Sequence, residues 1–178
     1  NKDNLFVVEM KKIRFEKNML MEILHYGVPS GIQNSMIGLA NVVVQSQINR
    51  FGSLATAAAG VHSKIEGFAF LPILSFNMAG TTFVSQNLGA KQYKRARKGA
   101  AFSIIATVLL AEGIGILHYT FAPVLVGLFD NTPGVVALGV RQARTVTLFY
   151  FLLAYSHSIA AICRGAGKAF APMFIMLS

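Results

Sequence analysis

Residues 86–99 read QNLGAKQYKRARKG, a polar segment between two apolar segments that are each long enough to cross a lipid bilayer. The segment contains five basic residues and no acidic one. Positive charge beside the end of a membrane span resists translocation, so a loop of this kind stays on the cytoplasmic side. Residues 86–98 therefore predict a cytoplasmic connector of a multi-pass membrane protein.

The composition agrees with a membrane protein and disfavours several other classes. Hydrophobic residues make up 54% of the 178 residues and charged residues 13%, against roughly 25% charged in an ordinary soluble domain. The net charge is +9, but the basic residues gather at the ends of apolar segments, so we expect no nucleic-acid partner. The single Cys163 and the absence of a Cys/His cluster predict no metal and no cofactor. No nucleophile and base share a helical spacing, so we expect no enzyme.

Hydrophobic segments predict an all-α, polytopic transmembrane helix bundle. The spans are expected at 27–48, 54–85, 99–129 and 135–163, with a fifth beginning at 169. The first span reaches roughly 33 Å at 1.5 Å per residue, enough for a ~30 Å hydrocarbon core. Pro29 is expected in its first turn, and Pro72 inside the second span is expected to bend it.

Residues 1–26 mix basic, acidic and apolar positions, as in a cytoplasmic linker or an interfacial helix. Alternation of sides then places the loops 49–53 and 130–134 outside and the basic loops 86–98 and 164–168 inside. We expect a multi-pass protein of the cytoplasmic membrane, of bacterial type. The sequence starts without Met and stops inside an apolar run, so we also expect a fragment of a longer protein.

Polar and aromatic residues recur at helical spacing within three of the predicted spans. The ones predicted to line a pathway are Asn34, Asn41 and Gln45 on the first span, Phe70 and Asn77 on the second, and Tyr150 and His157 on the fourth. Two interpretations stay open. These side chains either join neighbouring helices through hydrogen bonds or face a shared cavity that water can enter.

Acidic residues inside spans are costly and usually functional. Glu66 is the strongest candidate for a functional acidic residue, because it lies roughly 18 Å along its helix, deep in the bilayer. Lys64 is two residues away and points to a different helix face, so it is not expected to pair with Glu66. Glu112 in the third span is either a pathway residue or a neutral packing residue beside Gly113 and Gly115. His157 is either a proton relay or a packing residue.

These motifs together resemble the C-terminal half of the multidrug and toxic compound extrusion (MATE) family. The resemblance rests on GVP at 27–29, NRFG at 49–52, KIE at 64–66, FLP at 70–72, QNLGA at 86–90 and RGAG at 164–167. It covers about residues 27–178, with 1–26 similar to the linker between lobes. The resemblance implies twelve helices in two six-helix lobes, and this chain would supply helices seven to ten and part of eleven.

The resemblance also implies export of organic cations in exchange for protons or sodium. Sodium-coupled members carry acids where this sequence has Ile37 and Leu153, and Lys168 replaces a frequent acid. The expected partners are membrane lipid, the N-terminal lobe of the same protein, small organic cations, and a coupling proton or sodium ion. Alternatives are a lipid-linked oligosaccharide flippase of the same superfamily, and a channel or noncatalytic membrane subunit.

Overall fold

The computed structural model describes residues 16–168 and 170–177, and within those ranges the chain is helical without strands. The helices are α1 (Lys17–Asn49), α2 (Ser53–Gly89), α3 (Tyr93–Gly127), α4 (Pro133–Thr147), α5 (Tyr150–Gly165) and α6 (Phe170–Leu177). The prediction of an all-α helix bundle is confirmed. Residues 1–15, which belong to the predicted linker, and Ala169, where the fifth span was expected to start, lie outside the described residues.

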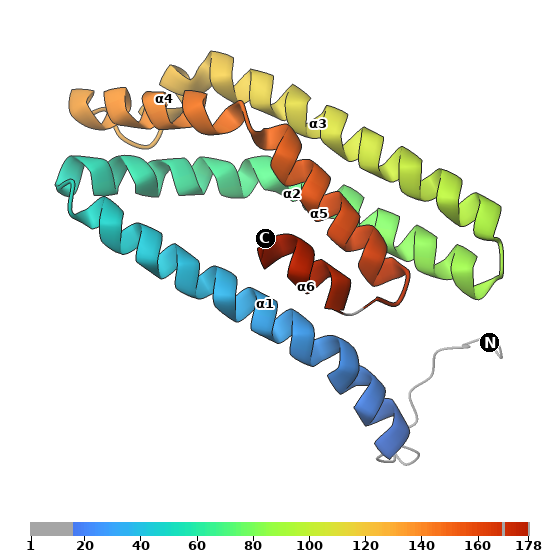
Figure 1. Ribbon diagram of the computed structural model, residues 1–178. Helices are drawn as coiled ribbons and strands as arrows, with labels where there is room; N and C mark the ends of the chain where they lie inside the picture. Colours follow the sequence, from blue (N-terminus) through green and yellow to red (C-terminus); the bar gives the residue numbers. More distant parts are fainter. Residues whose placement is uncertain (1–15, 169, 178) are drawn as a thin grey trace, which may run out of the picture.

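The chain reverses direction at each connection except the one between α4 and α5, where α5 continues in the general direction of α4, so the reversing connections gather at two ends of the molecule (Figure 1). The α1–α2 and α3–α4 turns lie at one end, and the α2–α3 and α5–α6 turns lie at the other. The start of α1 is also at the second end. This arrangement agrees with the alternation of loops that the sequence predicts, and it brings the basic loops 86–98 and 164–168 to the same end.

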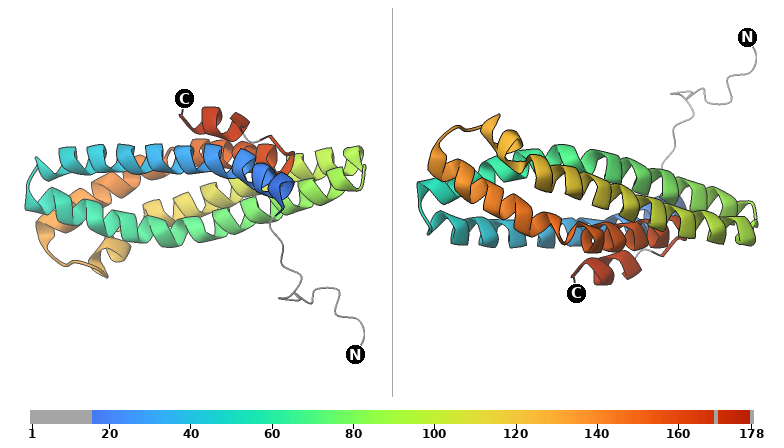
Figure 2. Two further views of the ribbon diagram at one scale, coloured as in Figure 1. Left: turned by 90° about the horizontal axis from the view of Figure 1, so that it is seen from below. Right: turned by 90° about the horizontal axis from the view of Figure 1, so that it is seen from above.

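Helices α2, α3, α4 and α5 pack closely together, while α1 diverges from them and meets α6 (Figures 1 and 2). One apolar core cluster joins Ala58, Val61 and Ile65 of α2 to Val126 of α3 and Val135 beside the start of α4. Along α1, by contrast, the buried positions are Pro29 and Gln33. The compact part of the structure is therefore the α2–α5 bundle, and it positions the polar residues described below.

Helix α1 begins at Lys17, ten residues before the predicted start of the first span. Residues 17–26 contain neither glycine nor proline and include two Met, two Leu, one Glu and one Lys, which are strong helix formers, so the helix continues through them. The expectation that Pro29 occupies a first turn is therefore wrong, because Pro29 lies inside the helix. Pro72 lies inside α2, as predicted.

The polar connector is shorter in the structure than the sequence suggested. Helix α2 continues to Gly89 and α3 begins at Tyr93, so most of the basic residues of 86–98 lie on the first turns of α3. Lys91 takes the left-handed backbone conformation with φ of 56°. Its N–H bonds the Leu88 carbonyl at 2.9 Å and the Gln92 N–H bonds the Asn87 carbonyl at 2.8 Å, which closes the end of α2.

The predicted fourth span, 135–163, is divided into α4 and α5, and the helix axis bends by 54° between them. Proline does not cause the break. The residues before it, Thr145, Val146 and Thr147, are all branched at Cβ, which lowers helix propensity. Phe149 then takes a non-helical conformation with φ of −109° and ψ of 8°. The segment predicted as the fourth span therefore consists of two helices separated by a sharp bend, and their joint crossing of the membrane stays a prediction.

Helices α2 and α3 are long and apolar enough to cross a membrane, and α4 with α5 forms a third candidate if the bent pair is one span. This result concerns the residues that the structure describes. The first predicted span, 27–48, is helical but is not among these candidates. Asn, Gln and Ser recur along α1 and lower its hydropathy.

Asp130, in the turn before α4, gives a test of the local structure. Its Oδ1 accepts a hydrogen bond from the Thr132 N–H at 2.8 Å, and this bond lowers the pKa of the Asp130 carboxyl because it favours the ionised form. The turn is therefore stabilised at neutral pH and loses this contribution as the pH falls through the lowered pKa. We expect NMR titration to give Asp130 a pKa below ~3.9.

Thr132→Pro is expected to move the Asp130 pKa back toward that ordinary value, because proline lacks the N–H donor. Proline fits the local backbone, since Thr132 has φ of −64°. Thr132→Val keeps the N–H and serves as the matched control. An unchanged Asp130 pKa in the proline variant contradicts the assignment of the backbone bond as the main cause.

Candidate functional site

A cluster of ionisable side chains is enclosed where α2, α3 and α5 meet. We call it the histidine cluster, and it consists of His62 and Glu66 of α2, His118 of α3 and Tyr150 of α5. His62 is 4% exposed, His118 3% and Tyr150 1%. The Glu66 side chain is 29% exposed. Three of the four groups are thus enclosed by protein, and the carboxyl group keeps partial access to the surface.

The four side chains form a continuous series of contacts. His62 Nε2 lies 3.7 Å from Glu66 Oε1, one helical turn further along α2. The imidazole rings of His62 and His118 stack with centroids 5.8 Å apart. His118 Nδ1 and the Tyr150 hydroxyl are hydrogen-bonded at 3.1 Å. The cluster therefore links three helices and ends at the Glu66 carboxyl group, which is its solvent-accessible member.

Two ring nitrogens of the cluster are enclosed without a hydrogen-bond partner. These atoms are Nδ1 of His62 and Nε2 of His118, and both are buried. Unpaired polar atoms in the interior are uncommon, because each one forfeits its hydrogen bond with water. Two adjacent rings inside the bundle therefore each keep one nitrogen available for a further hydrogen bond or a proton.

Aromatic residues flank the cluster on the side away from His62. The Phe70 ring meets Tyr150 edge to face at 5.5 Å between centroids. His157 lies 6.4 Å from Phe70 and its Nδ1 is 2.9 Å from the Leu153 carbonyl oxygen, within its own helix. Phe70 and Tyr150, both predicted pathway residues, are thus brought to Glu66, while His157 lies at the edge of the group.

Asn77 lies two turns beyond Phe70, at the crossing of α2 and α5. Ser158 Oγ donates a hydrogen bond to Asn77 Oδ1 at 3.1 Å. Thr81 Oγ1 lies 2.9 Å from the carbonyl oxygens of both Asn77 and Ala161, so it can donate to either. Asn77 therefore joins two helices in this structure, which was one of the two interpretations left open by the sequence.

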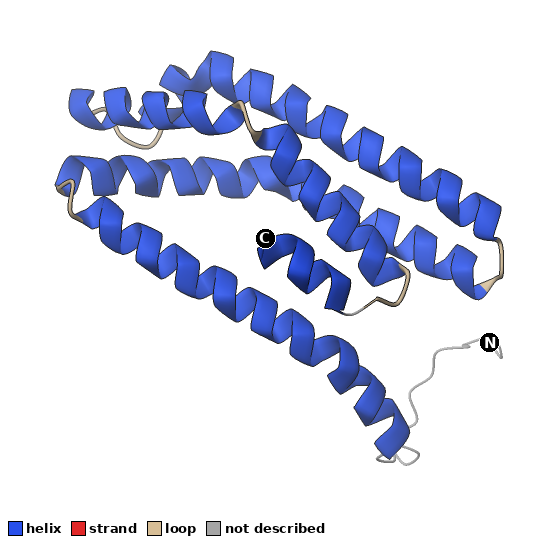
Figure 3. Ribbon diagram, viewed as in Figure 1, coloured by secondary structure: helices blue, strands red, loops and turns tan. Residues whose placement is uncertain are grey.

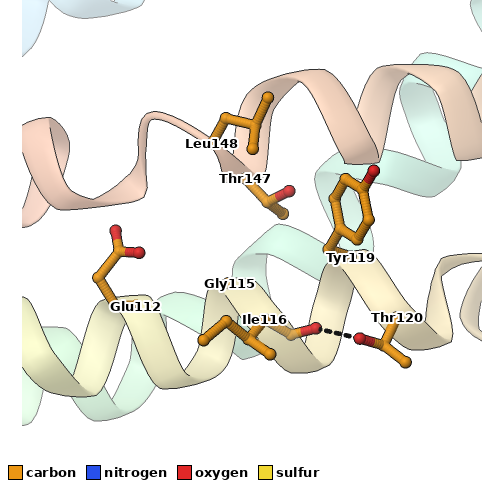
Figure 4. Close-up of a pocket in the computed structure, with 7 residues that line it drawn as sticks. All are labelled: Glu112, Gly115, Ile116, Tyr119, Thr120, Thr147 and Leu148. Carbon is orange, nitrogen blue, oxygen red and sulfur yellow. Dashed lines mark hydrogen bonds between the residues drawn. The ribbon is translucent and has the colours of Figure 1, made fainter.

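Glu112 lies apart from the histidine cluster. It lines a cavity of about 250 Å³ between α3 and the bend that joins α4 to α5, and Figure 4 shows its carboxyl group pointing toward that bend. Tyr119 and Thr147 border the same cavity. Glu112 Oε1 is buried without a hydrogen-bond partner. The Arg144 guanidinium lies over the ring of Tyr119, 5.3 Å from its centroid.

The three candidates on α1 are not brought to the cluster. Asn34, Asn41 and Gln45 are all exposed. Gln45 Nε2 donates to Asn49 Oδ1 at 3.0 Å on the same helix. Their role as wall residues stays a prediction, because α1 diverges from the α2–α5 bundle and presents them to the outside.

His62 and His118 were not among the predicted site residues. His62 lies four residues before Glu66, so the two share a face of α2. His118 shares the buried face of α3 with Ala111, Ala122 and Val126. Helical spacing could therefore have placed each histidine on an interior face, but the spacing of one helix carries no information on which residues of another helix it meets.

The long apolar helices α2 and α3 and the reversals of the chain between α1, α2, α3 and α4 are typical of a multi-pass α-helical membrane protein. The sequence profile of the MatE family matches residues 29–178. This chain belongs to the MatE family.

Several bacterial relatives share this similarity. The "Probable multidrug resistance protein YoeA" of Bacillus subtilis is 26% identical over 165 residues, covering 93% of this chain and 36% of the relative. The "Probable multidrug resistance protein NorM" of Neisseria meningitidis is 28% identical over 158 residues, covering 86% and 34%. The "FAD transporter" of Shewanella oneidensis is 26% identical over 114 residues, covering 64% and 25%. The chain spans about a third of the length of the curated relatives it matches.

Proposed function

We propose that this chain is part of the C-terminal lobe of a secondary transporter that exports organic cations in exchange for protons or sodium ions. Family membership supports a transport function. The names of the relatives from Bacillus and Neisseria support drugs as cargo. In this proposal, residues 27–178 form the lobe and 1–26 the linker to an N-terminal lobe. The two lobes rock against each other and expose a midplane site to each side in turn.

The observation that carries the proposal is the position of Glu66. Its carboxyl group is the one exposed end of a buried polar series, within a helix apolar enough to cross a membrane. A carboxylate at membrane depth attracts a cation strongly, because the surrounding dielectric constant is low. Phe70 supplies an aromatic face one turn away, and Tyr150 supports that face. Together they suit a flat or bulky organic cation.

The remaining predicted residues have subsidiary roles in the proposal. Asn34, Asn41 and Gln45 on α1 supply hydrogen-bonding groups on the surface toward the other lobe. Glu112 is a second acidic position along the pathway, bordering its own cavity. The positions of Ile37 and Leu153 favour protons over sodium as the coupling ion, since sodium-coupled members have acids there.

The test is transport by the full-length protein in proteoliposomes. We expect efflux of ethidium to depend on an imposed proton gradient and to stop when the gradient is collapsed by an ionophore. Flux that continues at the same rate without any gradient of protons or sodium contradicts an exchanger and indicates a channel.

Cargo charge separates the proposal from its nearest alternatives. A flippase for phosphate-linked oligosaccharides needs a positively charged cavity, and the Shewanella relative is named for FAD, a phosphate-containing molecule. The exposed charge of the histidine cluster is acidic. We therefore expect ethidium to compete with other organic cations and not with FAD, and competition by FAD alone contradicts the proposed cargo class.

A further inference from the structure

We propose that His62 is the proton-binding residue of this lobe, and that a proton held there cancels the charge of Glu66, so that proton and organic cation bind in turn. The inference rests on the proposed function and names the coupling ion and its site. It is carried by the geometry of the histidine cluster: a buried imidazole beside a carboxylate, with one ring nitrogen unpartnered.

The unpartnered nitrogen defines where the proton goes. An ionised Glu66 favours the tautomer of His62 with its hydrogen on Nε2, since that atom faces the carboxylate at 3.7 Å. Nδ1 then carries a free lone pair. A proton delivered by hydronium from the aqueous phase adds to this lone pair and forms an imidazolium, and the O–H bond that the proton leaves is the bond broken. The imidazolium and Glu66 become an ion pair.

His118 limits the cluster to one proton. Its ring stacks on that of His62 at 5.8 Å, and two imidazolium ions at this separation repel each other inside a protein. The Tyr150 hydroxyl fixes the orientation of His118 through Nδ1. His118 and Tyr150 are therefore positioning residues, which hold a neutral ring against His62.

Other charged groups near the cluster do not replace Glu66 as the partner of His62. On α2, Lys64 points away, with its ammonium 5.8 Å from the centroid of the Phe129 ring. On α3, Glu112 lines the separate cavity. On α4, Arg144 stacks on Tyr119, and on α5, His157 contacts Phe70.

A metal ion does not account for the cluster. Among the described residues, no three His, Cys, Asp or Glu side chains are arranged to hold one. A proton requires only the pair that is present.

The ion pair between protonated His62 and Glu66 makes binding of the proton and binding of the organic cation mutually exclusive. With His62 neutral, Glu66 presents a full negative charge to an organic cation. With His62 protonated, that charge is balanced and the attraction falls. Binding of either cation therefore weakens binding of the other by the same factor, which is the requirement for exchange.

The experiment measures ethidium binding to the full-length protein in nanodiscs between about pH 5 and 9. Wild-type affinity is expected to fall about tenfold per pH unit below the titration midpoint of the site, as required when one proton competes. His62→Gln is expected to bind with the high-pH affinity throughout. His25→Gln is the control, because His25 lies near the start of α1 with its ring against Phe170, and it is expected to keep the wild-type pH dependence.

A second measurement needs no variant and so does not depend on folding of a mutant. Adding ethidium to wild-type protein in weak buffer, near the titration midpoint, is expected to release a fraction of a proton per bound cation that approaches one as the pH is lowered. No proton release, or a His62→Gln protein with the wild-type pH dependence, overturns the inference. If the inference about His62 fails but ethidium transport still needs a proton gradient, the proposed function stands. If transport needs no gradient of protons or sodium, the proposed function and the inference about His62 both fail.

Discussion

Glu66→Gln is expected to weaken ethidium binding to the full-length protein by about 30-fold or more. The substitution removes the charge and retains the shape, and loss of a charge partner in a partly desolvated site costs ~2 kcal/mol or more, with tenfold in affinity for each ~1.4 kcal/mol. Gradient-driven efflux should fall in parallel, since the proton and the cation would no longer compete for one negative charge.

The matched control is Glu22→Gln, at an exposed position near the start of α1. It makes the same chemical change and the same change in net charge, and it is expected to bind ethidium as the wild type does. Binding that is equally strong in both variants removes Glu66 from the cation site. Equal weakening in both indicates a general electrostatic effect of the protein's charge.

Gly165→Ala is expected to destabilise the crossing of α2 and α5. A methyl group at Gly165 would lie 2.6 Å from the backbone oxygen of Thr81, and backbone cannot move aside as a flexible side chain can. The helices would have to separate and strain the hydrogen bond from Thr81 to the Ala161 carbonyl. Overpacking of this kind costs about 1–3 kcal/mol, so we expect a clear fall in melting temperature in detergent.

Gly113→Ala is the control for the glycine substitution. Gly113 lies inside α3 with open space around the position of a new methyl group, so alanine should be neutral or slightly stabilising through its higher helix propensity. A melting temperature for Gly165→Ala equal to that of wild type contradicts the close contact between α5 and α2.

The approximate positions of α1, α2 and α3 could be predicted because apolar length and basic loops are local features of the sequence. Turn residues before Pro133 and the basic residues at 86–98 marked real connections. The break at Leu148 could not be predicted in the same way. It has no proline or glycine, and a modest fall in helix propensity over three β-branched residues becomes a bend only when neighbouring helices favour it.

The candidate site was predictable in part. Glu66 stood out because an acid is costly in a membrane, and Phe70 followed from helical spacing, since it lies one turn further along the same helix. His118 and His62 did not, because their significance arises from stacking between α2 and α3. Contacts between helices depend on crossing angles and rotations, which residue spacing within one helix does not contain.

The bend between α4 and α5 lies directly before Tyr150, whose hydroxyl is held by a ring on α3. If α5 pivots about this joint while α3 keeps its place, the phenol is drawn away from the imidazole. The distance between the Tyr150 hydroxyl and His118 Nδ1 then depends on the angle between α4 and α5. Any change of angle at this joint would therefore alter the hydrogen bond that orients the His118 ring.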